Sequence, residues 1–349
     1  MRLYCVCCAL PRRVLEHVAR ETGDDHAVRM GEQHELSQRI RALRHEHGHV
    51  GTKPAPGGAR RRFVYDASGR LEPLPGRLAR KEGATAVPDK AVNQAYKNVG
   101  ITLDFYHQVF GRDSLDGRGM DVLASVHFGD RYANAMWNGT QMLFGDGDGV
   151  HIRGFTKSLD IVAHELTHAV TQHSIPGGLG VVRRQGKLDL VGEPGALNES
   201  ISDVFASLVQ QWHGKVKARD AQWLLGKGIL GPGLGKAVRS LKHPGRKKDT
   251  YPKDNQVPDM DGYDAAGDVH RNSGIPNRAF YLAARELGGY AWEDAGRVWY
   301  EAIPLLKARS SFADMAQATH KTAGRLFGNA SREQRAVRDA WAKVGVTRS

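Results

Sequence analysis

The sequence is almost free of cysteine. Cys5, Cys7 and Cys8 all lie within the first eight of 349 residues. The rest of the chain therefore folds without disulfides and depends on packing and on any metal it binds. No run of eighteen apolar residues is present, so we expect no membrane span. A conventional signal peptide is also missing, because Pro11 and two arginines follow the short apolar stretch after Arg2, where small residues are expected.

Basic residues outnumber acidic ones, and the net charge is +12. Such a charge can indicate a nucleic-acid partner, and Arg60, Arg61 and Arg62 with Lys247 and Lys248 form small basic groups. The other basic residues are scattered, and no helix-turn-helix or RNP stretch is present. We therefore expect a solvated basic surface and no nucleic-acid partner. The alternative, a nucleic-acid binder, would show steeply salt-dependent retention on DNA and no chelator-sensitive hydrolysis.

The length of the chain exceeds what one core usually fills, so two lobes and an accessory segment are expected. Residues 1–57 carry helical patterns and end in a linker rich in Gly and Pro. Residues 58–175 mix strand and helix patterns, and residues 176–349 are mostly helical. We predict an α+β fold with a β-rich N-terminal lobe, a helical C-terminal lobe and a site in the cleft between them.

Individual elements follow from periodicity and capping. Residues 63–66 and 122–128 are predicted strands, and residues 88–106 a helix with Pro88 in its first turn. Ser331 and Gln334 have the spacing of a capping box at the start of the last helix. Apolar residues recur at intervals of three and four in 201–212, 279–287, 292–306 and 312–326.

A predicted helix that Ser158 can cap carries the stretch His164-Glu165-Leu166-Thr167-His168. Residues four apart share a helix face, so both imidazoles can reach one zinc ion, with Glu165 beside the open coordination position. Zinc lowers the pKa of its water to about 7, and Glu165 can then act as general base. Two histidines can also fall four apart by chance on a half-buried helix.

A third metal ligand is expected from Glu199 on a second predicted helix. Asp203 lies four residues later on the same face, where it can orient a ligand histidine through the free ring NH. Asp160, four residues before His164, is a second candidate for that role. The alternative for Glu199 and Asp203 is a solvated acidic face.

In these features the sequence resembles the thermolysin family of metallopeptidases, and in particular its short, protealysin-like branch. The resemblance extends from about Arg62 to Gly345, and coincidence over that many separated segments is implausible. Besides the zinc helix, the segments that carry it are Asn134-Ala135-Met136-Trp137-Asn138-Gly139, Gly145-Asp146-Gly147-Asp148-Gly149, the segment from Asn198 to Asp203, and Val269-His270-Arg271-Asn272-Ser273-Gly274.

The resemblance implies roles for residues that spacing alone leaves without one. His270 would donate a hydrogen bond to the oxyanion formed during peptide hydrolysis. Asn134 and the backbone of Ala135 would hold the substrate main chain along a strand edge, and Arg239 would bind a substrate carbonyl beside the scissile bond. A bulky apolar residue just after the cleaved bond would be preferred. The candidates for the walls of its pocket, which can equally be ordinary core, are Phe155, Ile161 and Val238.

The sequence departs from the family pattern around the oxyanion site. No Tyr occurs between His168 and Glu199, where the family's oxyanion tyrosine is expected, and residues 175–194 hold an insertion. Transition-state stabilisation would then depend more heavily on zinc and His270. Ala265 stands where the carboxylate partner of that histidine is expected, and the candidates to replace it are Asp264 and Asp268.

Calcium is left open as a second cofactor. Gln210 stands where long family members have a calcium-binding glutamate, and losing an anionic ligand weakens a site for a hard cation. Asp146 and Asp148 are better explained as part of a tight turn.

The N-terminal segment resembles a short propeptide, with Leu10-Pro11-Arg12-Arg13-Val14-Leu15 in place of the family's proline-containing motif. This propeptide would block the cleft as an intramolecular inhibitor until autoprocessing between about Pro54 and Arg62 removes it. The three cysteines allow a further hypothesis, in which a thiolate occupies zinc's open position in the latent form. Ordinary buried or free thiols are the alternative.

Together these features predict a zinc metalloendopeptidase, made as a zymogen, that cleaves internal bonds of proteins or peptides. The alternative is a catalytically impaired zinc-binding relative that serves as an interaction module, against which the presence of Glu165 argues. Family members act outside cells, so secretion is expected. Without a conventional signal, a cytoplasmic location or non-standard export stays open. We expect a monomer.

Overall fold

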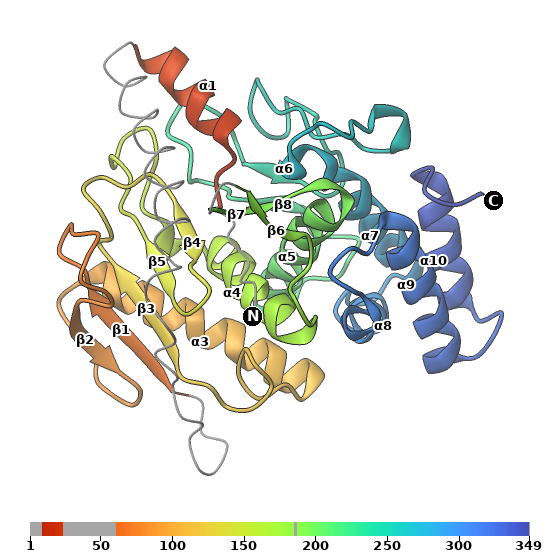
Figure 1. Ribbon diagram of the computed structural model, residues 1–349, viewed down its shortest axis with the longest axis horizontal. Coiled ribbons are helices and arrows are strands. Elements are labelled where there is room, and N and C mark those ends of the chain that lie inside the picture. The colour runs from red at the N-terminus through yellow and green to blue at the C-terminus, as the bar shows by residue number, and fades with distance from the viewer. Residues whose placement is uncertain (1–8, 24–60, 185–186, 349) are drawn as a thin grey trace.

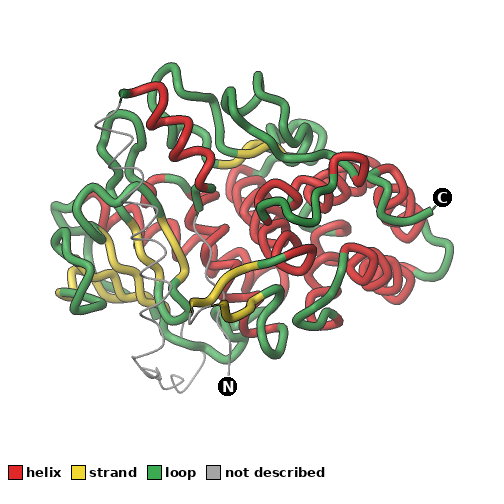
Figure 2. The backbone as a smooth tube through the Cα atoms, turned by 45° about the horizontal axis from the view of Figure 1, so that its top comes forward, coloured by secondary structure: helices red, strands yellow, loops and turns green. Residues whose placement is uncertain are grey.

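The structure, a computed structural model, describes residues 9–23, 61–184 and 187–348. The strands of the main sheet lie in one half of the molecule and most helices in the other (Figure 2). The predicted α+β architecture, with a β-rich N-terminal lobe and a helical C-terminal lobe, is confirmed. Within the described residues, no helix combines the length and the apolar character needed to cross a bilayer.

The N-terminal lobe is built on a five-stranded sheet with the strand order β2-β1-β3-β5-β4. β1 (Arg62–Asp66) pairs antiparallel with β2 (Arg77–Lys81) and parallel with β3 (Val122–Val126). β5 (Met142–Phe144) pairs parallel with β3 and antiparallel with β4 (Ala135–Trp137). Because β4 ends the strand order, its outer edge can pair with another extended segment.

Helix α3 (Lys90–Phe110) packs against β1 and against the helix α4 (Leu159–Ser174). Its N-cap is Asp89, whose side chain accepts hydrogen bonds from the amides of Ala91 and Val92. Pro88 therefore precedes the helix, and the expectation that it lies in the first turn was wrong. The Asp89 carboxylate accepts hydrogen bonds from amides that have no other partner at the helix start. A proline side chain has no atom that could accept these hydrogen bonds.

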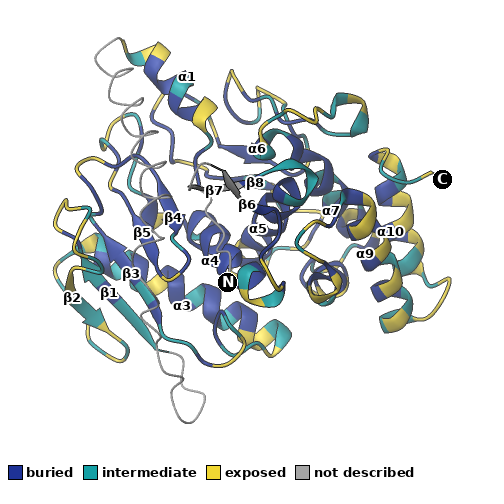
Figure 3. Ribbon diagram, viewed as in Figure 1, coloured by how far each residue is buried: buried dark blue, intermediate teal, exposed yellow. Residues whose placement is uncertain are grey.

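Two long helices form the centre of the molecule, α4 (Leu159–Ser174) and α5 (Gly192–Gly214). They pack against each other and are buried along most of their length (Figure 3). Between them in sequence lies a hairpin of β6 (Val181–Arg184) and β7 (Lys187–Leu190), which falls inside the predicted insertion.

On the C-terminal side (Figure 1), α5 is packed by α6 (Val269–Asn272), α7 (Gly274–Leu287) and α9 (Phe312–Phe327). The helices α8 (Asp294–Ala302) and α10 (Arg332–Lys343) pack against α7 and α9. The segments predicted from periodicity are helical. The segment 292–306 is divided into α8 and a short 3₁₀ turn (Ile303–Leu305) that contains a proline. The other elements are β8 (Leu224–Leu225), β9 (Arg239–Ser240) and the 3₁₀ turn Met260–Gly262.

The predicted capping box at α10 is half formed. The Ser331 hydroxyl accepts the amide of Gln334, but the Gln334 side chain accepts the amide of Ala330 and not that of Ser331. A complete box instead starts α9, where Ser311 and Asp314 each accept the other's backbone amide. A shorter Asp side chain serves there in the place where Glu or Gln is usual.

Candidate metal centre and substrate cleft

The two histidines of α4 point their Nε2 atoms at the same space. His164 and His168 are four residues apart on one helix face, both are buried, and their Nε2 atoms lie 3.1 Å apart. Glu199 of α5 faces them, with Oε2 3.5 Å from His164 Nε2 and Oε1 3.5 Å from His168 Nε2. The three predicted ligands are therefore brought together and form a group that could hold a metal ion.

The spacing of these atoms suits zinc. Ligand atoms at 2.0–2.1 Å from a tetrahedral zinc ion lie about 3.3 Å from one another. The nitrogen–nitrogen distance of 3.1 Å and the nitrogen–oxygen distances of 3.5 Å bracket that value. Two imidazoles and one carboxylate are also a donor set that catalytic zinc sites use, with a fourth position left for water or substrate.

Each histidine is held in place through its other ring nitrogen. His164 Nδ1 lies 2.9 Å from Asp203 Oδ1, as predicted for that carboxylate. His168 Nδ1 lies 2.8 Å from Asn198 Oδ1 and 3.0 Å from the Ser202 hydroxyl. These contacts turn both Nε2 atoms toward the metal position. Asn198 and Ser202 were not predicted, although their placement on α5 beside Glu199 and Asp203 was a signal for both.

Asp160 does not orient a ligand histidine. Its Oδ2 accepts the amide of Gly226 at 2.7 Å, and its Oδ1 accepts the Ser158 hydroxyl and the Ile161 amide. It thus ties the start of α4 to the loop that follows β8. The prediction that Asp160 is a second candidate to orient a ligand histidine was therefore wrong, because its carboxylate binds these other groups. The Ser158 side chain likewise binds Asp160, and no side-chain cap forms at that helix start.

Glu165 is buried beside the metal position. Its Oε2 accepts the backbone amide of Trp137 at 2.8 Å, which connects α4 to strand β4. Burial raises the pKa of Glu165 to about 8, and the negative charge of Glu199 acts in the same direction. A carboxylate whose affinity for a proton is raised in this way is suited to accept one from a reacting water.

Burial also acts on the ligand pKa values. Burial lowers the pKa of His168 to about 4. Burial acts in the same direction on His164, but its hydrogen bonds to Asp203 and Glu199 outweigh burial and raise its pKa to about 9, so a metal ion would have to displace a proton from this imidazole. Burial opposes ionisation of Glu199, but the charge of His270 and hydrogen bonds from His164 and His270 outweigh it and hold the pKa of Glu199 well below the ordinary value. An anionic Glu199 can compensate the charge of a bound cation.

His270 reaches the metal centre from α6. Its ring Nδ1 lies 2.8 Å from Glu199 Oε2. Asp268 caps α6 by accepting the His270 backbone amide at 2.8 Å, and Asp264 lies 3.4 Å from the Arg271 guanidinium. Asp264 also accepts the amide of Ala266, so these contacts of the two aspartates are not with the His270 ring, whose Nδ1 faces Glu199 instead.

The predicted substrate-binding residues surround a dipeptide of the chain's own N-terminal segment. The Ala9 amide donates to the carbonyl of Ala135 at 3.0 Å, on the outer edge of β4. Asn134 accepts the Leu10 amide at 2.9 Å and donates to the Leu10 carbonyl at 3.2 Å. Arg239 donates to the Ala9 carbonyl at 3.2 Å. Ala9 and Leu10 thus lie beside β4 and occupy groups that could hold the main chain of a bound peptide.

Arg239 connects this cleft to the metal centre. Its Nε donates to Asp203 Oδ1 at 2.9 Å, the oxygen that also faces His164. Asn277 donates to the other Asp203 oxygen at 2.9 Å. One buried carboxylate therefore positions both a metal ligand and the group that binds a main-chain carbonyl.

The helix α1 (Arg12–Thr22) follows this dipeptide and lies across the rim of the molecule (Figure 1). Val14, Leu15 and Val18 are buried. His17 Nε2 lies 2.8 Å from the Leu234 carbonyl, and the His17 ring lies 5.6 Å from that of Tyr251. The N-terminal segment is therefore docked by an apolar helix face as well as by backbone hydrogen bonds. Cys5, Cys7 and Cys8 lie outside the described residues.

The three candidates for the walls of the substrate pocket are fully buried, namely Phe155, Ile161 and Val238. Gln210, which stands in the place of a calcium-binding glutamate, is exposed. In the loop 145–149, Asp148 accepts the amides of Val150, His151 and Ile152, so this aspartate organises a turn.

Comparison with known proteins agrees with this geometry. Residues 60–172 match the family model described as the thermolysin metallopeptidase catalytic domain, and residues 186–346 match its alpha-helical domain. An extracellular metalloprotease of Pectobacterium carotovorum subsp. carotovorum is 38% identical over 98% of this chain and 96% of its own. Protease PrtS of a Photorhabdus species is 42% identical over 82% of this chain and 76% of its own. The precursor of protealysin, a metalloproteinase from Serratia proteamaculans, shares 40% identity over 98% of this chain and 100% of that structure, with a TM-score of 0.82. This chain is therefore a member of the thermolysin family of metallopeptidases.

Proposed function

We propose that this protein is a zinc-dependent endopeptidase that hydrolyses internal peptide bonds, with a preference for bulky hydrophobic residues after the cleaved bond. The observation that carries the proposal is the convergence of His164, His168 and Glu199 beside the buried carboxylate of Glu165. A zinc ion held by these three residues would polarise the substrate carbonyl and acidify a water molecule.

The roles of the chain's own residues follow from their positions. Glu165, fixed by the Trp137 amide, takes a proton from the attacking water and passes it to the leaving nitrogen. His270, the second residue of α6, donates a hydrogen bond to the oxyanion as it develops. Asn134, Ala135 and Arg239 align the substrate main chain along β4, as they do for Ala9 and Leu10.

We further propose that the chain is a zymogen in which residues 1–57 form the propeptide and linker, residues 58–175 the N-terminal catalytic lobe and residues 176–349 the C-terminal lobe. Ala9 and Leu10 take up the hydrogen-bonding groups that a substrate needs, so a substrate cannot bind while they remain. The relative from Serratia is itself described as a precursor. Autoprocessing between about Pro54 and Arg62 would free the cleft, and secretion is proposed because a relative is named as extracellular.

Replacement of Glu165 tests the catalytic proposal. Glu165→Gln should lower peptide cleavage by at least about 100-fold, because removing a general base typically costs 10²–10⁴ in rate. Its zinc content should equal that of the unchanged chain, and the exposed Glu286→Gln serves as the matched control. Cleavage that persists in Glu165→Gln would contradict the mechanism. A chain that holds zinc but cleaves nothing even after residues 1–57 have been removed would instead be the interaction module.

A further inference from the structure

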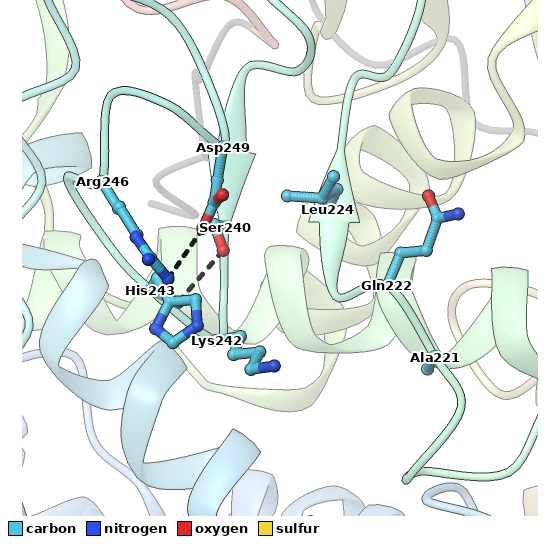
Figure 4. A pocket seen from close by; sticks show the side chains of 8 residues that line it. All are labelled: Ala221, Gln222, Leu224, Ser240, Lys242, His243, Arg246 and Asp249. Carbon is cyan, nitrogen blue, oxygen red and sulfur yellow. Dashed lines mark hydrogen bonds and ion pairs between the residues drawn. The ribbon is translucent and has the colours of Figure 1, made fainter.

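A second cavity lies behind the strand that carries Arg239. In β9 the Arg239 side chain faces Asp203 and the cleft, and the next side chain, Ser240, points to the opposite face because strand residues alternate. Ser240 lines a cavity of about 320 Å³ (Figure 4). The lining of this cavity is separate from the metal ligands and from the residues that bind Ala9 and Leu10.

The cavity has two chemically different walls. On one side lie Ala221, Gln222 and Leu224, which provide apolar surface and one amide. On the other side, the segment after β9 provides two cations, an imidazole and a carboxylate. Figure 4 shows the two sets on opposite sides of the space. The residues of the second wall are Lys242, His243, Arg246 and Asp249.

The lining of this cavity carries a net positive charge. Lys242 and Arg246 are exposed cations on the same short segment, and Asp249 is the acidic group among the lining residues. Arg246 lies 3.7 Å from Asp249 in an exposed ion pair, so Lys242 leaves one net positive charge among the lining residues. Burial and then the charges of Arg246 and Lys242 hold the pKa of His243 below its ordinary value, against the opposing effect of Asp249.

Hydrogen-bond donors accompany this charge. The Ser240 hydroxyl accepts the His243 amide at 3.0 Å and keeps its own hydrogen to donate. Arg246 offers a planar fork of donors and Lys242 a compact ammonium group, which together suit the oxygens of a carboxylate or a phosphate. Leu224 lies opposite, where a short apolar group attached to such an anion would find apolar surface.

We propose that this cavity is a binding site for a small oxyanion, a carboxylate or a phosphate, held by Lys242, Arg246 and the Ser240 hydroxyl. The site is independent of the proposed peptidase activity, since its lining includes none of the metal ligands and none of the residues that bind Ala9 and Leu10.

Calorimetric titration of the full chain at constant ionic strength tests this site with two probes. Inorganic phosphate represents a free inorganic anion, and N-acetylglycine represents an organic carboxylate. Saturable binding of either probe is expected, and the probe that binds identifies the kind of anion. The double variant Lys242→Ala/Arg246→Ala should weaken binding at least tenfold. The double variant Lys247→Ala/Lys248→Ala removes the same charge from exposed neighbours that do not line the cavity, and it should bind as the unchanged chain does.

Three outcomes would overturn the site. These are the absence of saturable heat with both probes, equal weakening of binding by both double variants, and binding that survives in Lys242→Ala/Arg246→Ala. Equal weakening would indicate a diffuse effect of net charge, and survival would locate the anion elsewhere, for example at the metal centre. A histidine NMR signal assigned by His243→Gln gives a second readout, because a bound anion should shift His243 and not the exposed His213.

Discussion

The metal centre and the substrate cleft share Asp203 but are built in different ways. The metal centre uses side chains at fixed spacing on two helices, α4 and α5, and each ligand is held by a buried neighbour. The cleft combines a strand edge, an arginine about a hundred positions further along the chain, and the N-terminal segment. Short-range spacing therefore selects the side chains on each helix face and the packing of α4 on α5 joins the two faces, whereas the cleft depends on contacts between more distant parts of the chain.

Removal of a metal ligand should separate the two regions most strongly. His168→Ala deletes one of three ligands, so zinc binding and peptide cleavage should both fall by at least about 1000-fold, because three ligands act as one unit. The N-terminal segment should stay docked, which protease protection of α1 can measure. His213→Ala on the exposed end of α5 is the control, and equal zinc loss there would show that the effect is not local.

Asp203→Asn should affect both regions. Loss of a carboxylate that orients a ligand histidine typically weakens metal binding by about 10–100-fold. Arg239 loses its charged partner as well, so KM for peptides should rise even at saturating zinc. Competition with a zinc chelator and steady-state kinetics measure the two effects. The exposed Asp220→Asn should change neither, and a variant of Asp203 with unchanged zinc affinity would break the proposed link between centre and cleft.

Loosening α1 should open the cleft without touching the metal. Leu15→Asp places a charge on the buried face of the helix and should raise the activity of the uncut chain by about tenfold, because burying an unpaired charge is unfavourable. Cleavage of a short peptide by chain that remains intact on a gel provides the measurement. Arg20→Asp introduces the same residue on the exposed face and should leave activity low. Equal activity of the two variants would mean that α1 does not hold the cleft closed.

A smaller effect is expected at His127, which lies in neither region. Hydrogen bonds to Asp146 and Asp89 raise the pKa of His127 to about 9, so this cation links the loop 145–149 to the start of α3. Its stabilisation should be complete below about pH 6.5 and lost as the pH rises through about 9. His127→Gln should therefore lower the free energy of unfolding by about 1 kcal/mol near about pH 6 and by almost nothing above about pH 10. Denaturant unfolding at both pH values measures this difference in the free energy of unfolding, with the exposed His107→Gln as control. A difference that is the same at both pH values would contradict the assignment.

The sequence predicted the parts of the site that local rules determine. A spacing of four on a helix places His164 with His168, and Glu199 with Asp203, whatever the rest of the fold does. Asp160 has the same spacing from His164, yet it binds Gly226, 66 positions away, which only the tertiary structure reveals. The Trp137 amide that holds Glu165 is a backbone group, so no side chain in the sequence could indicate it.

The most direct test of this account is the zinc content of the purified chain, measured by inductively coupled plasma mass spectrometry after dialysis. About one zinc per chain is expected for the unchanged protein and for Glu165→Gln, and well below about one tenth of that for His164→Ala. A chain without zinc, or equal zinc in the unchanged protein and in His164→Ala, would contradict the claim that His164, His168 and Glu199 hold the catalytic metal.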